Sequence, residues 1–131
     1  MFSKINIMGK ILDVKLKRHE LLSNNLANVD TPGYKRSDIS FEDKLKDYLS
    51  RTTIPLVTTN AKHINTKSSI YDLKPEIFQQ YNRSFRNDQN NVDVEREMVE
   101  LTKNTFSYNI IADQIQNNFK ILQTAISEGR K

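Results

Sequence analysis

The chain has 131 residues, a formal net charge of +4 and no cysteine, so disulfides and thiolate metal sites are excluded. Hydrophobic residues make up 37% of the chain, which is low for a globular domain, and they are concentrated toward the two ends. We therefore expect one small domain that is marginally stable alone and completes its folding by association.

Residues 4–29 are predicted to form an amphipathic helix, because their apolar positions follow a nearly regular spacing of four and three. Lys15 and His19 interrupt this stripe. The helix also carries several basic side chains, which would suit an anionic polymer, an anionic membrane or an acidic partner, although interspersed acidic residues favour a solvated face. The predicted seam positions of this helix are Ile5, Met8, Leu12, Leu22, Leu26 and Val29.

A turn and a polar middle region follow the first helix. Pro32 disfavours helical geometry at the residue before it, and Gly33 supplies the positive φ that a type II turn needs. Ser40 is predicted to cap a short helix in the middle region, 35–91. The apolar periodicity fades in the segments that follow. The residue types of 52–59 are compatible with an extended segment, and those of 71–81 are ambiguous. Residues 83–91 are predicted to form a polar loop.

The last third of the chain is predicted to form one helix of about 50 Å, because no Gly or Pro interrupts its apolar seam. Asp93 is the predicted N-cap, and Gly129 follows the last turn. Glu95, Glu97 and Glu100 lie in the first two turns, where we interpret them as charges favoured by the helix dipole. The seam, in spacings of four and three, is predicted to consist of Val94, Met98, Leu101, Thr105, Tyr108, Ala112, Ile115, Phe119, Leu122 and Ile126.

Terminal helices with matching seams predict a mainly α fold in which the two helices form an antiparallel, coiled-coil-like pair. Residues 1–34 and 92–131 would form one discontinuous domain, and 35–91 a small region with a short helix and irregular or extended segments. Periodicity alone leaves two alternatives open. The helices either bury each other as a simple hairpin, or both also pack against neighbouring copies of the chain.

Sequence motifs for catalysis are absent. The chain has no Gly-rich phosphate-binding loop, no H-E-x-x-H zinc motif and no grouping of Ser, His and Asp that predicts a catalytic triad. Two isolated histidines, His19 and His63, are not expected to bind a metal. We expect a protein that is not an enzyme and uses no cofactor, with neither a cleavable signal peptide nor a membrane-spanning segment.

The most specific feature of the sequence is the segment Ser23–Lys35, which reads SNNLANVDTPGYK. It resembles the N-terminal signature shared by the rod and hook proteins of the bacterial flagellum, S-x-N-L-A-N-x-x-T-x-G-Y-K, and matches every fixed position. A helix end accounts for the proline and glycine but not for the asparagines, which we expect to bond free carbonyls or a neighbouring chain. The signature residues are Ser23, Asn25, Leu26, Ala27, Asn28, Thr31, Pro32, Gly33, Tyr34 and Lys35.

A second segment, Asn90–Met98, resembles the C-terminal signature of the same family, N-x-V-x-x-E-x-x-M leading into a helix. Together with the short chain and the segment 59–64, it makes the chain most similar to the proximal rod proteins within that family. Gln89 departs from the family pattern, in which Gly is expected at this position of an N-D-G-N turn.

The resemblance implies a structural subunit of the flagellar basal body, in the proximal rod that links the motor and export apparatus to the distal rod and hook. It implies passage through the flagellar type III export channel, without a cleaved signal peptide, to the rod within the cell envelope. The implied partners are other rod proteins, the export-gate junction protein at the rod base and copies of the chain itself, with no nucleic acid and no membrane insertion. The alternative, suggested by the basic first helix, is a cytosolic helical adaptor or nucleic-acid-associated protein.

Overall fold

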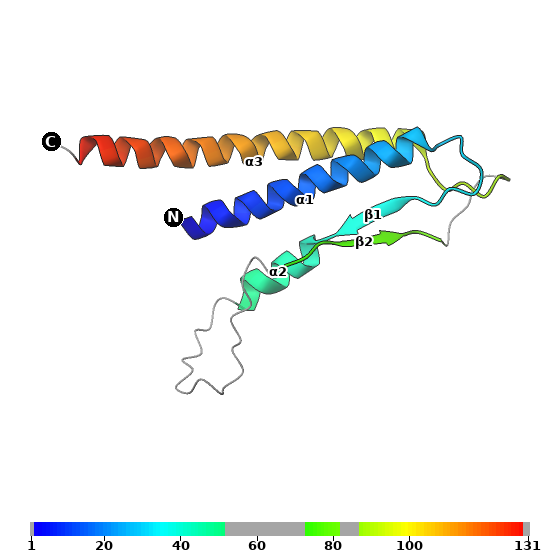
Figure 1. Ribbon diagram of the computed structural model, residues 1–131, viewed down its shortest axis with the longest axis horizontal. Helices are drawn as coiled ribbons and strands as arrows, with labels where there is room; N and C mark the ends of the chain where they lie inside the picture. The colour runs from blue at the N-terminus through cyan, green and yellow to red at the C-terminus, as the bar shows by residue number, and fades with distance from the viewer. Residues whose placement is uncertain (1, 52–72, 82–86, 130–131) are drawn as a thin grey trace, which may run out of the picture.

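The computed structural model of the protein describes residues 2–51, 73–81 and 87–129. The molecule is elongated, with two long helices and a short two-stranded sheet lying side by side (Figure 1). The elements in chain order are α1 (Phe2–Ala27), β1 (Ser37–Ser40), α2 (Glu42–Arg51), β2 (Glu76–Gln79) and α3 (Val94–Glu128).

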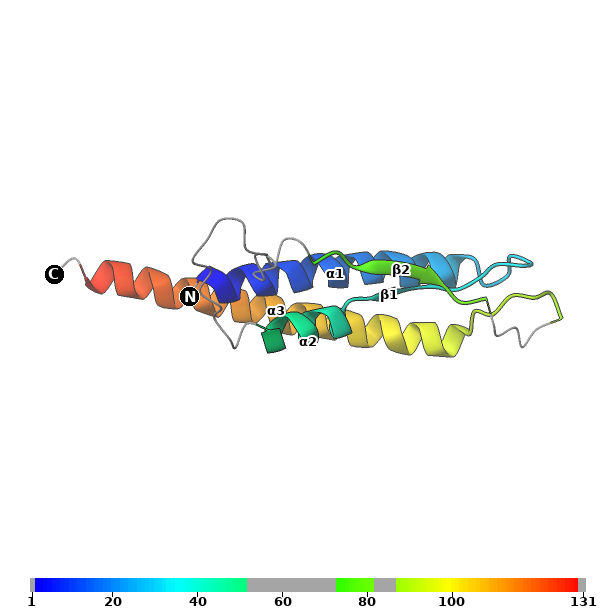
Figure 2. The ribbon, with the colours of Figure 1, turned by 90° about the horizontal axis from the view of Figure 1, so that it is seen from below.

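The two long helices, α1 and α3, run antiparallel and pack against each other along most of α1 (Figures 1 and 2). α3 has 35 residues against 26 in α1, and its last turns extend past the N-terminal end of α1. The predicted mainly α fold, with long terminal helices and a small middle region of strands and irregular chain, is confirmed. Among the described residues, no helix is long and apolar enough to cross a membrane.

The N-terminus of α3 is capped as the sequence predicts. The Asp93 carboxylate accepts hydrogen bonds from the backbone N–H groups of Glu95 and Arg96, at 3.0 and 3.3 Å. At the other end, the Gly129 N–H donates to the carbonyl oxygen of Ala125 at 3.1 Å. With no break between these caps, α3 is one rod of about 52 Å, at 1.5 Å per residue.

α1 ends at Ala27, two residues before the predicted boundary. The chain then turns through Pro32 and Gly33, where the Tyr34 N–H donates to the Thr31 carbonyl at 3.3 Å. Gly33 has a φ of +74°, the positive value predicted for this turn. This backbone conformation strains any residue that has a Cβ atom, which accounts for glycine here.

The sheet lies against one side of the helix pair, closest to α1 (Figures 1 and 2). β1 and β2 pair antiparallel, with Ser37 opposite Gln79 and Ser40 opposite Glu76. The segment 71–81, ambiguous in sequence, therefore contains a strand. A small apolar core joins α1 to this layer, and its members are Val14, Ile39 and Phe41, surrounded by Ile11, Leu21, Leu45 and Leu73.

The prediction that Ser40 caps α2 is wrong, since Ser40 is the last residue of β1 and α2 begins at Glu42. The physical reason is the next side chain: Phe41 is 2% exposed and part of the core. Its carbonyl oxygen accepts the N–H of Leu45 at 2.9 Å, which places the helix start after the phenylalanine. Burial of Phe41 thus fixes the boundary between strand and helix.

Some expectations fall outside the described residues. These are the extended segment at 52–59, the family-like segment 59–64 and the assignment of His63.

Candidate assembly site

Asn25, from the first signature segment, is fully buried and uses both ends of its amide. Its Nδ2 donates to the Ser37 carbonyl oxygen at 2.8 Å and to Glu97 Oε2 at 2.9 Å. Its Oδ1 accepts the Ser37 N–H at 3.0 Å and the Tyr34 hydroxyl at 3.2 Å. One side chain on α1 therefore joins the turn, β1 and α3, and no part of its amide is left unpaired.

A buried ion pair lies beside this asparagine. Glu97 is 1% exposed, and its Oε1 accepts a hydrogen bond from Nε of Arg36, itself 3% exposed. Arg36 Nη1 also donates to Asp38 Oδ2 at 2.8 Å. Burial alone would lower the pKa of the Arg36 guanidinium, but the hydrogen bonds and charges of Glu97 and Asp38 outweigh burial and raise it. The interpretation of Glu97 as a dipole charge is therefore incomplete: it sits in the first turn but serves as a buried partner.

Asn90, the first residue of the second signature segment, is also fully buried and closes the end of α1. Its Nδ2 lies 2.8–3.0 Å from the carbonyl oxygens of Asn28, Val29 and Thr31, and its Oδ1 accepts the N–H of Val92 at 2.8 Å. Carbonyl groups after a helix end lack helical partners. Asn90 supplies a hydrogen-bond donor for these carbonyl groups from a position 59 to 62 residues further along the chain.

The loop before Asn90 is shaped by a residue in the left-handed region. Gln89 has a φ of 63°, the only positive value for a non-glycine residue in the described part of the chain. The Gln89 carbonyl accepts the Lys35 ammonium at 2.6 Å, and the neighbouring Asp88 carbonyl accepts the Gly33 N–H at 2.9 Å. Gln89 thus occupies the position where glycine was expected, with the backbone geometry that favours glycine.

The remaining signature residues lie around this cluster. Asn28 Nδ2 donates to the Asn24 carbonyl at 2.8 Å, and Asn28 Oδ1 accepts the Thr31 hydroxyl at 3.3 Å, so both contacts are local. Leu26 is partly buried. The exposed signature residues are Ser23, Ala27, Thr31, Pro32 and Gly33.

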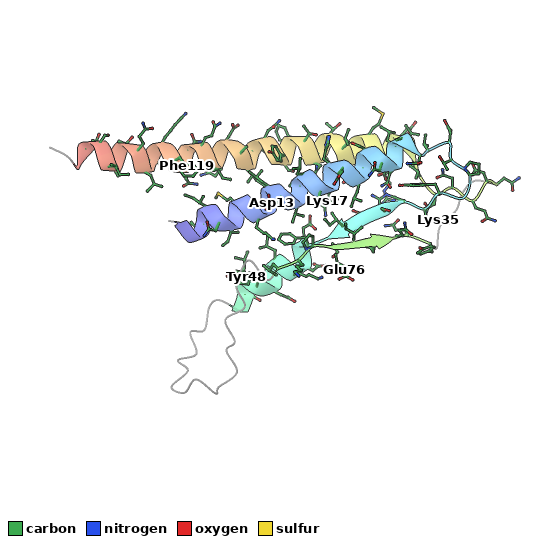
Figure 3. All side chains as sticks on the ribbon, in the orientation of Figure 1. Asp13, Lys17, Lys35, Tyr48, Glu76 and Phe119 are labelled. Atoms are coloured by element: carbon green, nitrogen blue, oxygen red, sulfur yellow. The ribbon has the colours of Figure 1, made fainter. Side chains whose placement is uncertain are left out.

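Residues of the predicted seams fall into a buried, a partly buried and an exposed group in the single chain. Leu22 on α1 is buried, and the partly buried group consists of Ile5, Met8, Leu12, Leu26, Val29, Leu101, Tyr108, Ala112, Ile115 and Leu122. The exposed set lies on α3 and consists of Val94, Met98, Thr105, Phe119 and Ile126. Phe119 is half exposed and projects from the part of α3 near the N-terminus of α1 (Figure 3).

Polar side chains occupy the face of α3 that meets α1, and the apolar pattern alone did not predict them there. Besides Glu97, these are Asn104, whose Nδ2 donates to the Lys15 carbonyl at 2.8 Å, and Asn118, whose Nδ2 lies 3.7 Å from the sulfur of Met8. Together with residues of the predicted seam, these polar residues form a second stripe along α3, with spacings of four and three, next to the predicted one. This second stripe consists of Glu97, Leu101, Asn104, Tyr108, Ile111, Ile115, Asn118 and Leu122.

Burial divides the helix pair into two ends. We call residues 14–36 and 88–104 the junction end, because loops join the helices there, and residues 2–13 and 105–129 the free end. Every buried side chain described on α1 and α3 lies in the junction end. Among the side chains described in the free end, none is buried, although that end carries several large apolar residues.

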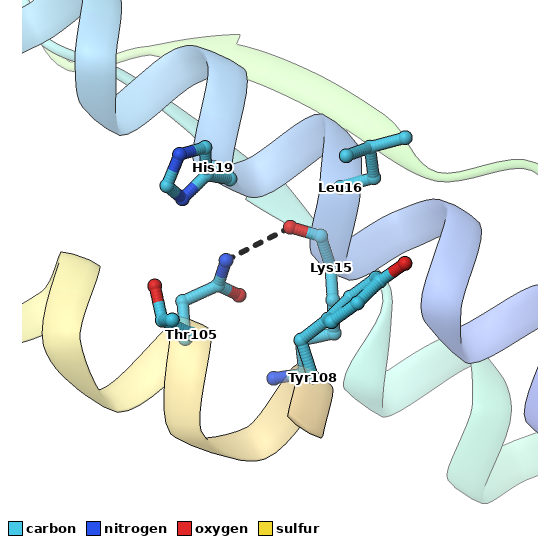
Figure 4. A pocket seen from close by; sticks show the side chains of 6 residues that line it. Lys15, Leu16, His19, Thr105 and Tyr108 are labelled. Atoms are coloured by element: carbon cyan, nitrogen blue, oxygen red, sulfur yellow. Dashed lines mark hydrogen bonds between the residues drawn. The ribbon is translucent and has the colours of Figure 1, made fainter. Parts of the chain in front are cut away.

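A groove of about 250 Å³ lies between α1 and α3 where the two ends meet (Figure 4). Asn104 is 4% exposed, and its Oδ1 has no hydrogen-bond partner within the described part of the chain. Burial and the neighbouring Arg18 lower the pKa of the Lys15 ammonium, against the opposing effect of nearby carboxylates. The lining residues are Lys15, Leu16, His19, Asn104, Thr105 and Tyr108.

Basic residues in the middle of α1 are paired with carboxylates. Arg18 donates through both terminal nitrogens to Glu42, at 2.5 and 2.9 Å, and through one of them to the Ile39 carbonyl at 2.8 Å. Lys17 pairs with Glu20 at 2.6 Å. Both contacts compensate part of the positive charge that suggested an anionic partner, and the Arg18–Glu42 contact also ties α1 to the start of α2.

Comparison with known proteins identifies the relatives of the chain. A sequence model described as "Flagella basal body rod protein" matches residues 16–35, which hold most of the junction end of α1 and the turn. The flagellar basal body rod protein FlgB of Aquifex aeolicus is 39% identical over 82% of this chain and 80% of its own length. FlgB of Buchnera aphidicola is 34% identical, covering 94% and 99%, and FlgB of Escherichia coli is 28% identical, covering 95% and 94%.

Proposed function

The chain belongs to the FlgB family of flagellar basal body rod proteins, which are structural proteins, and on that premise we propose that it is a subunit of the proximal rod. In that place it forms part of the drive shaft that links the motor and export apparatus to the distal rod and hook. It reaches the rod through the flagellar type III export channel. Its partners are other rod proteins, the export-gate junction protein at the rod base and further copies of itself.

One observation carries the assembly part of this proposal: apolar side chains of the predicted seam at the free end are exposed in the single chain. Phe119 is 53% exposed and Ile126 is 74% exposed in the single chain, although both lie in a regular apolar repeat. Apolar side chains at such spacing are the contacts by which helices pack knobs into holes. Exposed apolar stripes of this kind mark interaction surfaces in soluble proteins. The free end is therefore the surface that neighbouring subunits cover.

The junction end has the complementary role. Its buried polar cluster holds α1, the turn, β1 and α3 in one register before any partner binds. An incoming subunit then meets a helix pair whose free end is already aligned, which reduces the conformational entropy lost on association. Assembly requires only that the exposed faces be covered.

The first test is a clean deletion of the gene in a flagellated bacterium that carries it, with complementation from a plasmid. Swimming and basal-body rods, seen by electron microscopy, are expected to be lost in the deletion and restored by the gene. Intact rods and normal swimming in the deletion strain would contradict the assignment.

The second test places a charge on the exposed stripe. Phe119→Asp is expected to block rod assembly while leaving the fold of the isolated subunit unchanged, because this side chain is exposed before assembly. Gln114→Asp is the matched control, since Gln114 is exposed on a different side of the same helix. Equal rod assembly by the two variants would contradict the proposed use of this stripe.

A further inference from the structure

The groove between α1 and α3 holds a polar atom that lacks a partner. Asn104 uses its Nδ2 for the Lys15 carbonyl, but its Oδ1, buried with the rest of a side chain that is only 4% exposed, accepts no hydrogen bond from the described residues. An unsatisfied buried acceptor costs about 1–3 kcal/mol, so its retention points to a donor that arrives from outside the chain.

The lining of the groove restricts the chemistry of that donor. Leu16 and Tyr108 present apolar surface, while Lys15 and His19 place basic groups around it (Figure 4). A cationic donor would meet the charge of Lys15, and a carboxylate cannot donate when ionised. A neutral amide on an apolar helix face satisfies both conditions.

The free end of α3 carries such a face. Its exposed side chains at spacings of three, four and three alternate between amide and apolar groups, in the order Gln116, Phe119, Gln123 and Ile126. The spacing places all four along one stripe of the helix. The last turns of α3 extend past the N-terminal end of α1 (Figures 1 and 2), and both Gln123 and Ile126 are exposed in the single chain.

We propose that this stripe of one copy docks into the groove of a second copy, with a glutamine amide, Gln123 foremost, donating to Asn104 Oδ1. The inference rests on the proposed function, which it deepens by naming the partner and its contact. A single chain cannot make the contact, because Thr105 in the groove and Gln123 lie on one straight helix about 27 Å apart. The interface is heterologous, joining two different surfaces, and such contacts repeat into rings or helical assemblies.

The chain has no cysteine, so disulfide trapping reports this contact without background. Thr105→Cys and Gln123→Cys are made separately in the full chain and mixed under mild oxidation, both as purified protein and by co-expression in the deletion strain. Gln114→Cys replaces Gln123→Cys as the matched control on a different side of α3. A disulfide requires Cα atoms within about 7 Å, so only a seated stripe is trapped.

The yield of the 105–123 disulfide is expected to exceed that of the 105–114 disulfide about tenfold, because a hydrogen bond to one buried acceptor favours the seated arrangement by about that factor. Adding Asn104→Leu to Thr105→Cys is expected to remove most of that excess, because the acceptor is gone. Leu16→Cys, on the exposed wall of the groove, provides a second groove position if Thr105→Cys disturbs the helix pair.

Equal yields of the two disulfides in cells that build intact rods would overturn the proposal and leave the rod assignment standing. Trapping of the Thr105→Cys variant only on a cysteine of a different rod protein would also overturn it, by assigning the groove to another occupant. Failure of the rod assignment has a separate readout, since a deletion strain that swims would contradict that assignment whatever the disulfides show.

Discussion

The two ends of the helix pair both expose apolar side chains, but they differ in what they bury. The junction end buries polar and charged side chains, including Asn25, Asn90 and Glu97, at or below 1% exposure. The free end leaves apolar side chains exposed, with Ile126 at 74%. Buried polar groups are stable only with specific partners, so they determine one arrangement of the chain. Apolar groups accept many partners, which suits a surface that is completed by other subunits.

The largest expected effect comes from breaking the ion pair of the junction end. Glu97→Ala leaves the Arg36 guanidinium buried without its main partner, which should lower the free energy of unfolding by about 3–5 kcal/mol. In a chain this small the loss is expected to abolish cooperative unfolding in urea. Glu95→Ala, in the same first turn but exposed, is the control and should cost about 1 kcal/mol or less. A Glu97→Ala protein as stable as this control would show that the junction end is not held by the pair.

Removing the amide that closes α1 should have the next largest effect. Asn90→Ala leaves the carbonyls of Asn28, Val29 and Thr31 without this donor, and we expect a loss of about 2 kcal/mol in urea unfolding. Asn87→Ala changes an exposed asparagine in the same loop and should stay within about 0.5 kcal/mol of the parent. Equal losses from the two changes would contradict the role assigned to Asn90.

A third change should strengthen the junction end and so sharpen the contrast. Gln89→Gly removes the strain of a φ of 63° at a residue with a Cβ atom and is expected to raise the free energy of unfolding by about 1 kcal/mol. Gln89→Ala keeps the Cβ atom and should give no such gain. A glycine variant no more stable than the alanine variant would contradict the backbone strain assigned to this position.

The smallest effect concerns the charges that join α1 to α2. Burial would raise the pKa of the Glu42 carboxyl, but the hydrogen bond and charge of Arg18 outweigh it and lower that pKa below its ordinary value of 4.5. A lowered folded-state pKa adds stability above the unfolded value, and this stability is lost as the pH falls through the folded value. The parent should therefore lose more stability than Glu42→Gln when unfolding is measured below pH 4.5. The difference should be small because the Glu42 side chain is 58% exposed.

The sequence predicts best those features that local chemistry determines. The turn at Gly33 and the cap at Asp93 follow from residues within a few positions of each. The two long helices follow from apolar periodicity, which is nearly regular in α1 and uninterrupted in α3. These features need no knowledge of distant contacts.

Features that depend on distant partners were predicted less well. The burial of Glu97 depends on Arg36, 61 residues earlier, and the start of α2 depends on the packing of Phe41 into a core shared with α1. Asn104 was not assigned to the helix interface because the predicted seam follows apolar spacing. That spacing selects Thr105, one position after Asn104. The signal that identifies Asn104 is a polar side chain in step with Leu101 and Tyr108.

The central claim, that the junction end is formed in the single subunit and the free end is completed by assembly, is tested most directly by amide hydrogen exchange. In the isolated protein, residues 18–27 of α1 and 97–104 of α3 should exchange slowly, and residues 4–11 and 115–128 much faster. In assembled rods both regions should be protected. Equal protection of the two ends in the isolated subunit would contradict the account, since the free end would then need no partner to complete it.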